Sequence, residues 1–252
     1  MLVLENISKA FASNSEPILR DLSLHLRNGD FTILIGGNGS GKSTLLKLIQ
    51  GEHQPDKGRI LLDELDLTSS PLHRRAAYIS CVAQDVHSGT VKELTLFENL
   101  ALSRLRGEKA RFTRASLHRE FCKQQISSLG PGLQRFLDIP LTSLSGGQKQ
   151  MLALVMATAR KPKLLLLDEH CSALDPKISQ ELMSHTEKLI REHSVTTLMV
   201  THSLTDALRY GDRLIMLREG RIILDASANE KASLTVPDLL KLYHHYEDSS
   251  LL

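Results

Sequence analysis

The sequence predicts an α/β fold in which a largely parallel sheet is flanked by helices and interrupted by a helical insertion. Short apolar segments at residues 31–36 (FTILIG), 162–169 (PKLLLLDE) and 194–202 (SVTTLMVTH) have the length and composition of buried strands. Helix-like sequence separates them, as connections between parallel strands require. The charged, helix-like sequence of residues 92–141 interrupts this alternation, so we expect this segment to be inserted into the α/β core.

The first third of the chain contains most of the remaining strand signals. Residues 19–26 (LRDLSLHL) alternate leucine with polar side chains, which is typical of a half-buried strand. The strand at 31–36 leads into a glycine-rich loop and then into residues 42–50, whose leucines and isoleucine form one helical face that ends before Gly51. Residues 58–67 (GRILLDELDL) predict a strand pair, and residues 76–84 (AAYISCVAQ) predict a further strand.

The last part of the chain returns to the α/β pattern. Residues 213–225 (RLIMLREGRIILD) predict a hairpin that turns at Glu219-Gly220. We therefore expect a single domain over residues 1–252. Its α/β core, with a β subdomain, is built from residues 1–88 and 160–252, and residues 89–159 form a helical subdomain.

Composition excludes several classes of protein. The chain has 31 basic and 29 acidic residues, a net charge of +2, which argues against binding to nucleic acid. The cysteines, three in all, lack a CxxC spacing and indicate neither a disulfide framework nor a zinc site. The start of the chain lacks the pattern of a secretory signal, and the longest apolar run, residues 152–159, is too short to cross a bilayer. We expect a soluble, cytoplasmic chain.

The glycine-rich loop after the first buried strand has the spacing of a phosphate-binding loop. Residues 36–43 (GGNGSGKS) satisfy G-x-x-x-x-G-K-[ST], with a strand before and an amphipathic helix after. Backbone N–H groups and the helix N-terminus would hold the phosphates. Lys42 would reach the β- and γ-phosphates, and the Ser43 hydroxyl would bind Mg²⁺. The alternative is an ordinary turn with a surface lysine.

A second hard ligand for Mg²⁺ is available at the end of the LLLLDE strand. Asp168 has the position of the carboxylate that holds the metal in phosphate-loop enzymes, directly or through water. Glu169 is placed to polarise an attacking water as a general base. The alternative is that Asp168 only caps a turn.

A further glycine-containing segment, LTSLSGGQKQ at residues 141–150, precedes a long helix and is also suited to an anion. With this segment, the ordered motifs resemble the ATP-binding subunit of an ABC (ATP-binding cassette) transporter over nearly the whole chain. LSGGQ matches the family signature, SALD matches the loop after the catalytic glutamate, and VTH matches the switch histidine. The resemblance implies a P-loop NTPase fold of the RecA-like type, with a mixed sheet, an antiparallel β subdomain and a helical subdomain.

The resemblance also assigns roles to individual residues. The catalytic set that it implies is Glu169, His202, Gln84 and Lys42. The nucleotide-binding set is Phe11, Gly36, Gly37, Asn38, Gly39, Ser40, Gly41, Lys42, Ser43 and Thr44. The signature loop, which contacts a partner's ATP, is Leu144, Ser145, Gly146, Gly147 and Gln148, and the following loop contributes Ser172 and Asp175. The Mg²⁺ set is Ser43, Gln84 and Asp168. For Phe11, packing in the core remains the alternative to stacking on adenine.

The same resemblance implies a mechanism and partners. Two chains, expected to be identical, would sandwich two ATP molecules between the phosphate loop of one and the signature loop of the other. Closure and hydrolysis would energise solute transport through a separate membrane permease, which would hold the subunit at the inner face of the cell membrane. The six basic residues between Arg104 and Arg119 are expected to be a solvated helix face rather than a permease contact.

Two departures from the commonest family wording point to a narrower group. Gly37 and His170 both replace the usual proline, and His170 is expected mainly to shape its turn. With the segments IGGNGSGKST and LLLLDEHCSALDPK, they resemble ATPases of bacterial uptake systems of the tryptophan/tyrosine type. Those systems also use a periplasmic binding lipoprotein, so we expect import of an amino acid or a similar small solute. The alternatives are an exporter subunit, a soluble ABC ATPase that acts on ribosomes or DNA, a P-loop kinase or GTPase, and a cassette that does not hydrolyse ATP.

Overall fold

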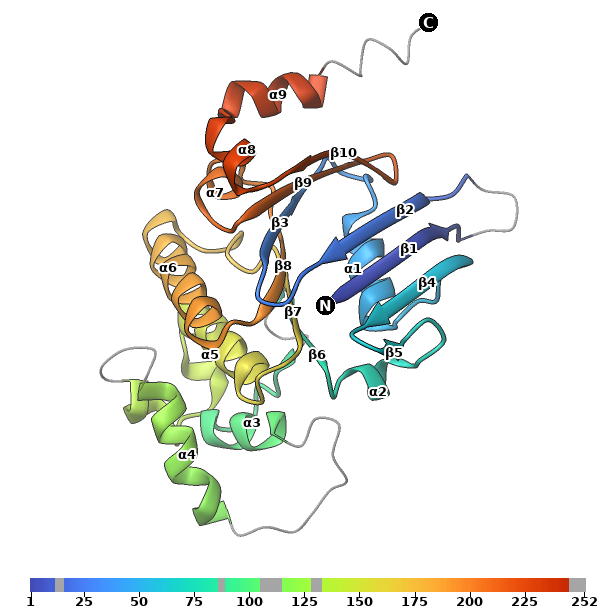
Figure 1. Ribbon diagram of the computed structural model, residues 1–252. Coiled ribbons are helices and arrows are strands. Elements are labelled where there is room, and N and C mark those ends of the chain that lie inside the picture. The colour runs from blue at the N-terminus through green and yellow to red at the C-terminus, as the bar shows by residue number, and fades with distance from the viewer. Residues whose placement is uncertain (12–15, 86–88, 105–114, 128–132, 245–252) are drawn as a thin grey trace, which may run out of the picture. The chain divides into compact units, whose positions relative to one another are not determined.

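The computed structural model describes residues 1–11, 16–85, 89–104, 115–127 and 133–244 (Figure 1). The chain divides into two compact units. Unit 1 comprises residues 1–72 and 194–252, and unit 2 comprises residues 73–193. No helix in the described ranges is both long and apolar enough to cross a membrane. Most of the basic stretch 104–119 lies outside these ranges.

Unit 1 contains an antiparallel sheet in the order β2-β1-β4-β5. Its strands are β1 (Leu2–Lys9), β2 (Leu19–Leu26), β4 (Lys57–Leu62) and β5 (Leu65–Asp66). The alternation in β2 places its leucines inside and its polar residues outside, as the sequence predicts. This sheet is the expected β subdomain.

The parallel part of unit 1 holds the phosphate-loop strand between two neighbours. β3 (Phe31–Ile35) pairs in parallel with β8 (Thr196–Val200) and with β9 (Arg213–Arg218). β9 turns at Glu219-Gly220 into the antiparallel β10 (Arg221–Ala226). The helices of this unit are α1 (Lys42–Gln50), α7 (Leu204–Arg209), α8 (Ala228–Ser233) and α9 (Val236–His244).

Unit 2 combines a parallel strand pair with helices. β6 (Ile79–Val82) pairs with β7 (Leu164–Asp168), and all four leucines of β7 are buried. The α-helices are α3 (Leu96–Ser103), α4 (Ala115–Ser127), α5 (Gly146–Thr158) and α6 (Pro176–His193). Single 3₁₀ turns occur at Leu133–Phe136 and Leu141–Ser143, and α2 (Leu72–Arg75) lies at the boundary with unit 1.

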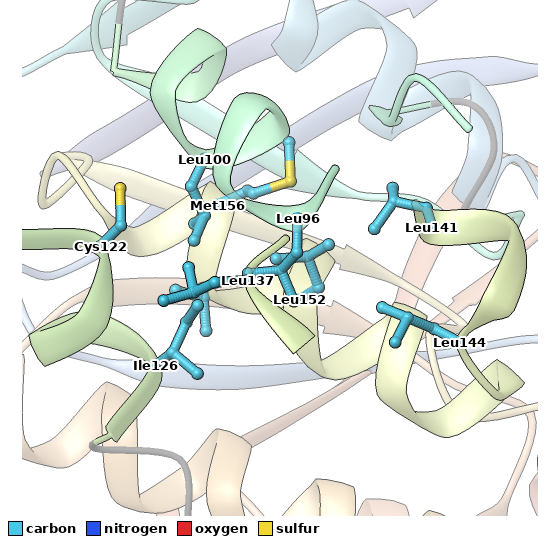
Figure 2. Packing of buried hydrophobic residues seen from close by; sticks show 10 residues of the cluster. Leu96, Leu100, Cys122, Ile126, Leu137, Leu141, Leu144, Leu152 and Met156 are labelled. Carbon is cyan, nitrogen blue, oxygen red and sulfur yellow. The ribbon is translucent and has the colours of Figure 1, made fainter. Parts of the chain in front are cut away.

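Helices α3, α4 and α5 of unit 2 pack around a shared apolar core, which fixes the start of α5. Figure 2 shows its side chains converging from α3, α4, α5 and the turns that precede α5. The buried members are Leu96, Leu100, Cys122, Ile126, Leu137, Leu141, Leu144, Leu152, Val155 and Met156. Because the side chain of Leu144 is packed in this core, the position of the next residue, Ser145, which is the N-cap of α5, is fixed.

Candidate functional site

The phosphate loop of unit 1 begins where β3 ends and closes at the N-terminus of α1. A Cβ on Gly36 would lie 2.3 Å from the Leu217 carbonyl oxygen, so only glycine allows this close approach to β9. Gly41 caps the helix in the left-handed region at φ +105°, which also favours glycine. The two glycines therefore shape a narrow loop that leads directly into a helix N-terminus.

The Lys42 ammonium lies inside this loop. Its Nζ donates to the Gly36 carbonyl at 2.7 Å and to the Gly37 carbonyl at 3.0 Å. A phosphate oxygen is a stronger acceptor for an ammonium than a neutral carbonyl, so an incoming phosphate can exchange with these contacts. Ser43, the next residue, is exposed.

The outer side of the loop borders a pocket of about 240 Å³. The loop contributes residues 37–40, the end of β9 and the turn after it contribute residues 216–219, and α9 contributes Tyr243. Burial raises the pKa of Tyr243, and a hydrogen bond with the Gly36 backbone acts in the opposite direction. Arg218 also donates to the Tyr243 carbonyl at 3.2 Å, so α9 is held against the end of the phosphate loop.

Phe11 is not a core residue, because 52% of its surface is exposed. Its ring meets His53 edge to face, with ring centroids 5.0 Å apart, and the Lys9 ammonium lies 5.8 Å from its centroid. Asp56 fixes the preceding residues: it accepts from Lys9 Nζ and from the Ala10 N–H, each at 2.7 Å. These hydrogen bonds lower the pKa of Asp56. An exposed, positioned ring is a suitable platform for a nucleobase.

His202 lies in the same unit as the phosphate loop. It follows β8, whose Val200 is in register with Leu34 of β3, and the adjacent Thr201 N–H donates to the Leu34 carbonyl at 3.2 Å. The exposed His202 thus leaves the sheet beside the strand that feeds the loop. Unit 1 therefore carries Phe11, the whole phosphate loop and His202.

Unit 2 brings Gln84, Glu169 and Ser172 together. Gln84 follows β6 and donates from Nε2 to Ser172 Oγ at 3.2 Å. The Ser172 N–H in turn donates to the Glu169 carbonyl at 3.0 Å. Two segments that are distant in sequence, one after β6 and one after β7, are therefore joined at the carboxyl ends of neighbouring parallel strands. This is the edge of a parallel sheet at which ligands usually bind.

The backbone of Glu169 is strained. Its φ of +46° lies in the left-handed region, which costs a residue other than glycine about 1–3 kcal/mol. The next residue, His170, is buried, and burial lowers the pKa of its imidazole from 6.5 to about 4. Its Nε2 lies 3.2 Å from the Thr186 hydroxyl of α6. Shaping of this turn by His170 was expected from the sequence, but the anchor on Thr186 was not.

The signature segment starts α5 with a capping box. Ser145 is the N-cap: its Oγ accepts from the Gln148 N–H at 3.3 Å, and the Gln148 side chain accepts from the Ser145 N–H at 2.9 Å. Ser145 and Gly146 are exposed. Asp175 caps α6 in a similar way, by accepting from the Ile178 N–H at 3.1 Å.

Gln150 connects the signature helix to the Gln84 segment, which the sequence did not indicate. It is buried, and its Nε2 donates to the Ala83 carbonyl at 3.2 Å, while its Oε1 has no hydrogen-bond partner. A buried amide oxygen without a hydrogen-bond partner lowers the stability of the fold. The hydrogen bond from Nε2 to Ala83 is therefore the favourable polar contact that Gln150 makes here. A glutamine two residues beyond LSGGQ is the one available signal for it.

The residues proposed for Mg²⁺ belong to different units, Ser43 to unit 1 and both Gln84 and Asp168 to unit 2. Ser43 offers an exposed hydroxyl, and Asp168 offers a half-buried carboxylate at the end of β7. Among the described residues, no group of three or more His, Cys, Asp or Glu side chains forms a metal site. Mg²⁺ commonly binds through one or two protein oxygens, phosphate oxygens and water, so a hydroxyl or a carboxylate of this kind is a suitable type of ligand.

Comparisons with known proteins show the family of this chain. Residues 19–172 match the family model described as "ABC transporter". The tyrosine transport ATP-binding protein of Clostridioides difficile is 41% identical over 249 residues, which are 97% of this chain and 99% of that protein. The spermidine/putrescine import ATP-binding protein PotA of Haemophilus influenzae is 35% identical over 91% of this chain, which spans 59% of PotA.

Solved structures of ATP-binding cassettes are also similar to this chain. A dimeric structure of the ATP-binding cassette MJ0796, in a post-hydrolysis state bound to ADP and Pi, superimposes with a TM-score of 0.77 at 28% identity. The match covers 90% of this chain and 99% of that one. The chain therefore belongs to the ABC transporter family, as one of its ATP-binding cassettes that hydrolyse ATP.

Proposed function

We propose that this cassette energises import of an amino acid through a separate membrane permease. The observation that carries the proposal is the 41% identity, end to end, with a tyrosine transport ATP-binding protein. In this proposal the permease holds the cassette at the inner face of the membrane, and a substrate-binding lipoprotein delivers the solute. Residues 89–159 serve as the helical signature subdomain.

The proposed working unit is a pair of identical chains that share two ATP molecules. Each nucleotide stacks on Phe11, and its phosphates bind the loop that contains Lys42. The signature loop of the other chain closes on the γ-phosphate through Ser145. The exposed N-cap of α5 supports this role, because a helix N-terminus attracts an anion.

The catalytic assignment follows the same residues. When bound with the nucleotide, Mg²⁺ neutralises charge on the phosphates, and Ser43, Gln84 and Asp168 would hold it. Glu169 takes a proton from the attacking water, and His202 contacts the γ-phosphate. Loss of the γ-phosphate removes charge-assisted hydrogen bonds that favour the closed pair, so hydrolysis opens it.

A mixing experiment tests the shared site. A Lys42→Ala chain and a Ser145→Arg chain should each be inactive, since both sites of either homodimer carry a defect. A mixed dimer has one site with both defects and one intact site. An equimolar mixture should recover up to roughly a quarter of the wild-type ATPase rate. No recovery above either variant alone, with mixed dimers present, would contradict the shared geometry.

The direction of transport needs a separate measurement. The cassette should co-purify with a permease from detergent extracts, and the complex in vesicles should take up amino acid only when binding lipoprotein is supplied. Glu169→Gln should retain ATP binding, accumulate the ATP-bound pair and abolish this uptake. Transport that proceeds without any binding protein, or in the outward direction, would favour an exporter.

A further inference from the structure

The strained residue at the end of β7 is the one proposed as general base. Left-handed backbone is disfavoured for L-residues and persists where neighbouring structure imposes it. A general base works only when its carboxylate is held within hydrogen-bond reach of the water that it activates. What holds the Glu169 backbone is therefore a question about catalysis as well as about folding.

Two of the constraints on Glu169 are backbone contacts. On its N-terminal side, β7 is in register with β6 up to the pair Val82 and Leu167. On its C-terminal side, the Ser172 N–H donates to the Glu169 carbonyl. The next residue is His170, so the anchoring of its side chain is a third constraint on this segment.

The buried His170 side chain is fixed by a hydrogen bond with Thr186. The residue is 3% exposed, and Thr186, in the middle of α6, is fully buried. The Thr186 hydroxyl donates its only proton to the Leu182 carbonyl at 2.8 Å. It can therefore only accept from the imidazole, so Nε2 of His170 carries the proton and donates across 3.2 Å.

We propose that His170 and Thr186 form a positioning pair that holds Glu169 in its left-handed conformation and so aims the carboxylate of the base. The proposal rests on the proposed role of Glu169 in hydrolysis. Thr186 lies one turn beyond Leu182 on α6, a helix of 18 residues, so the anchor is a rigid element and not a loop. In this arrangement the hydrogen bond affects the rate of the chemical step and leaves unaffected the contacts of ATP with Phe11 and the phosphate loop, which lie in unit 1.

A purely structural role for the pair predicts a different result. If His170 only fills the core, its loss should lower stability and the amount of active protein without a selective effect on turnover. Positioning predicts a fall in kcat per folded molecule at constant ATP affinity. Measuring both kcat and the dissociation constant for ATP therefore distinguishes a positioning role from a purely structural one.

The test is a matched pair of substitutions at Thr186 in the full chain. Thr186→Val preserves shape and removes the acceptor, whereas Thr186→Ser retains the hydroxyl. We expect Thr186→Val to lower kcat about 10- to 100-fold, with the ATP dissociation constant unchanged within about twofold. Thr186→Ser should keep most of the wild-type kcat. Equal losses in both variants, or an unchanged kcat in Thr186→Val, would overturn the proposal.

A second pair covers the case in which Thr186→Val does not fold. His170→Gln keeps an N–H donor at a similar distance from the backbone, and His170→Leu does not, so the glutamine variant should be at least several times faster. Equal rates would refute positioning. Glu169→Gln serves as the reference for the base itself. If Glu169→Gln turns over normally, the proposed catalytic role fails; if only Glu169→Gln is slow, the positioning pair alone fails.

Discussion

The signature glycines provide a sharp test of how the structure constrains this motif. A Cβ added to Gly147 would lie 2.5 Å from Ile178 Cγ2, on the first turn of α6. A Cβ added to Gly146 would meet only Leu174 Cδ2, at an ordinary contact distance of 3.5 Å. Gly147→Ala should therefore be destabilising, and Gly146→Ala is its matched control.

The change in the free energy of unfolding caused by Gly147→Ala is the sum of two opposing effects. Alanine in a helix is favoured over glycine by about 0.5–1 kcal/mol, which both substitutions gain. Overpacking costs about 1–3 kcal/mol, and Ile178 relieves it poorly because the χ1 of a β-branched residue in a helix is stiff. We expect Gly147→Ala to lower the free energy of unfolding by about 1–2 kcal/mol. In an Ile178→Ala background the clash is absent, so the same change should raise it by about 0.5 kcal/mol.

The wild type, Gly147→Ala, Ile178→Ala and the double variant form a double-mutant cycle. Urea unfolding of these four proteins measures the coupling between Gly147 and Ile178, and ATPase activity is measured on the same samples. A coupling of about 1–3 kcal/mol is expected. An equal cost of Gly147→Ala in both backgrounds would refute the steric argument. If stability returns in the double variant while ATPase activity does not, the added methyl acts against the shared phosphate and not against α6.

Three further predictions concern single residues. Because the pKa of His170 is lowered from 6.5 to about 4, the unfolded chain takes up a proton below pH 6.5 that the folded chain does not. The free energy of unfolding should thus fall by up to about 3 kcal/mol over this range. Urea unfolding between pH 6.5 and pH 4, with EDTA present, should show this loss of stability in the wild type and not in a His170→Gln variant. An equal fall of the free energy of unfolding in both proteins would contradict the prediction. Burial raises the pKa of Cys122, so a variant with Cys122 as its sole cysteine should react with a thiol reagent at pH 8 much more slowly when folded than in urea. Comparable rates would contradict this. Phe11→Ala should weaken ATP binding about tenfold without lowering the melting temperature, because stacking is lost at an exposed site; an unchanged ATP affinity would exclude the stacking role.

The elements around the phosphate loop could be predicted because local sequence determines them. The apolar run of β3, the glycines and the amphipathic α1 each follow from residue type and spacing. Gly51 ends the helix as expected, and it does so in left-handed backbone. The hairpin at Glu219-Gly220 was predicted for the same reason. The α/β fold class and the family are confirmed by the matches with solved cassettes.

Features that depend on distant contacts were not predictable. β1 is a full strand of the antiparallel sheet, yet its alternation is interrupted by register shifts against both neighbours, which blur the period of two. The exposure of Phe11 depends on Asp56, which holds the preceding residues from 46 positions away. Likewise, nothing in the spacing of His170 and Thr186 indicates that they form a hydrogen bond, because that pairing requires the position of α6 relative to β7.

Ser145 shows how one side chain can meet a local and a distant requirement together. As N-cap it must present an oxygen to the Gln148 N–H, a task that serine, threonine, aspartate and asparagine all perform. In the proposed pair it must also approach a γ-phosphate of the other chain, which an aspartate would repel and which a larger side chain would keep away. A hydroxyl that accepts from its own helix still has a proton to donate, so serine satisfies both requirements. In the proposed pair the capping box would therefore do more than start α5: because the Ser145 oxygen serves as the acceptor, its hydroxyl proton would remain to donate to the partner's phosphate.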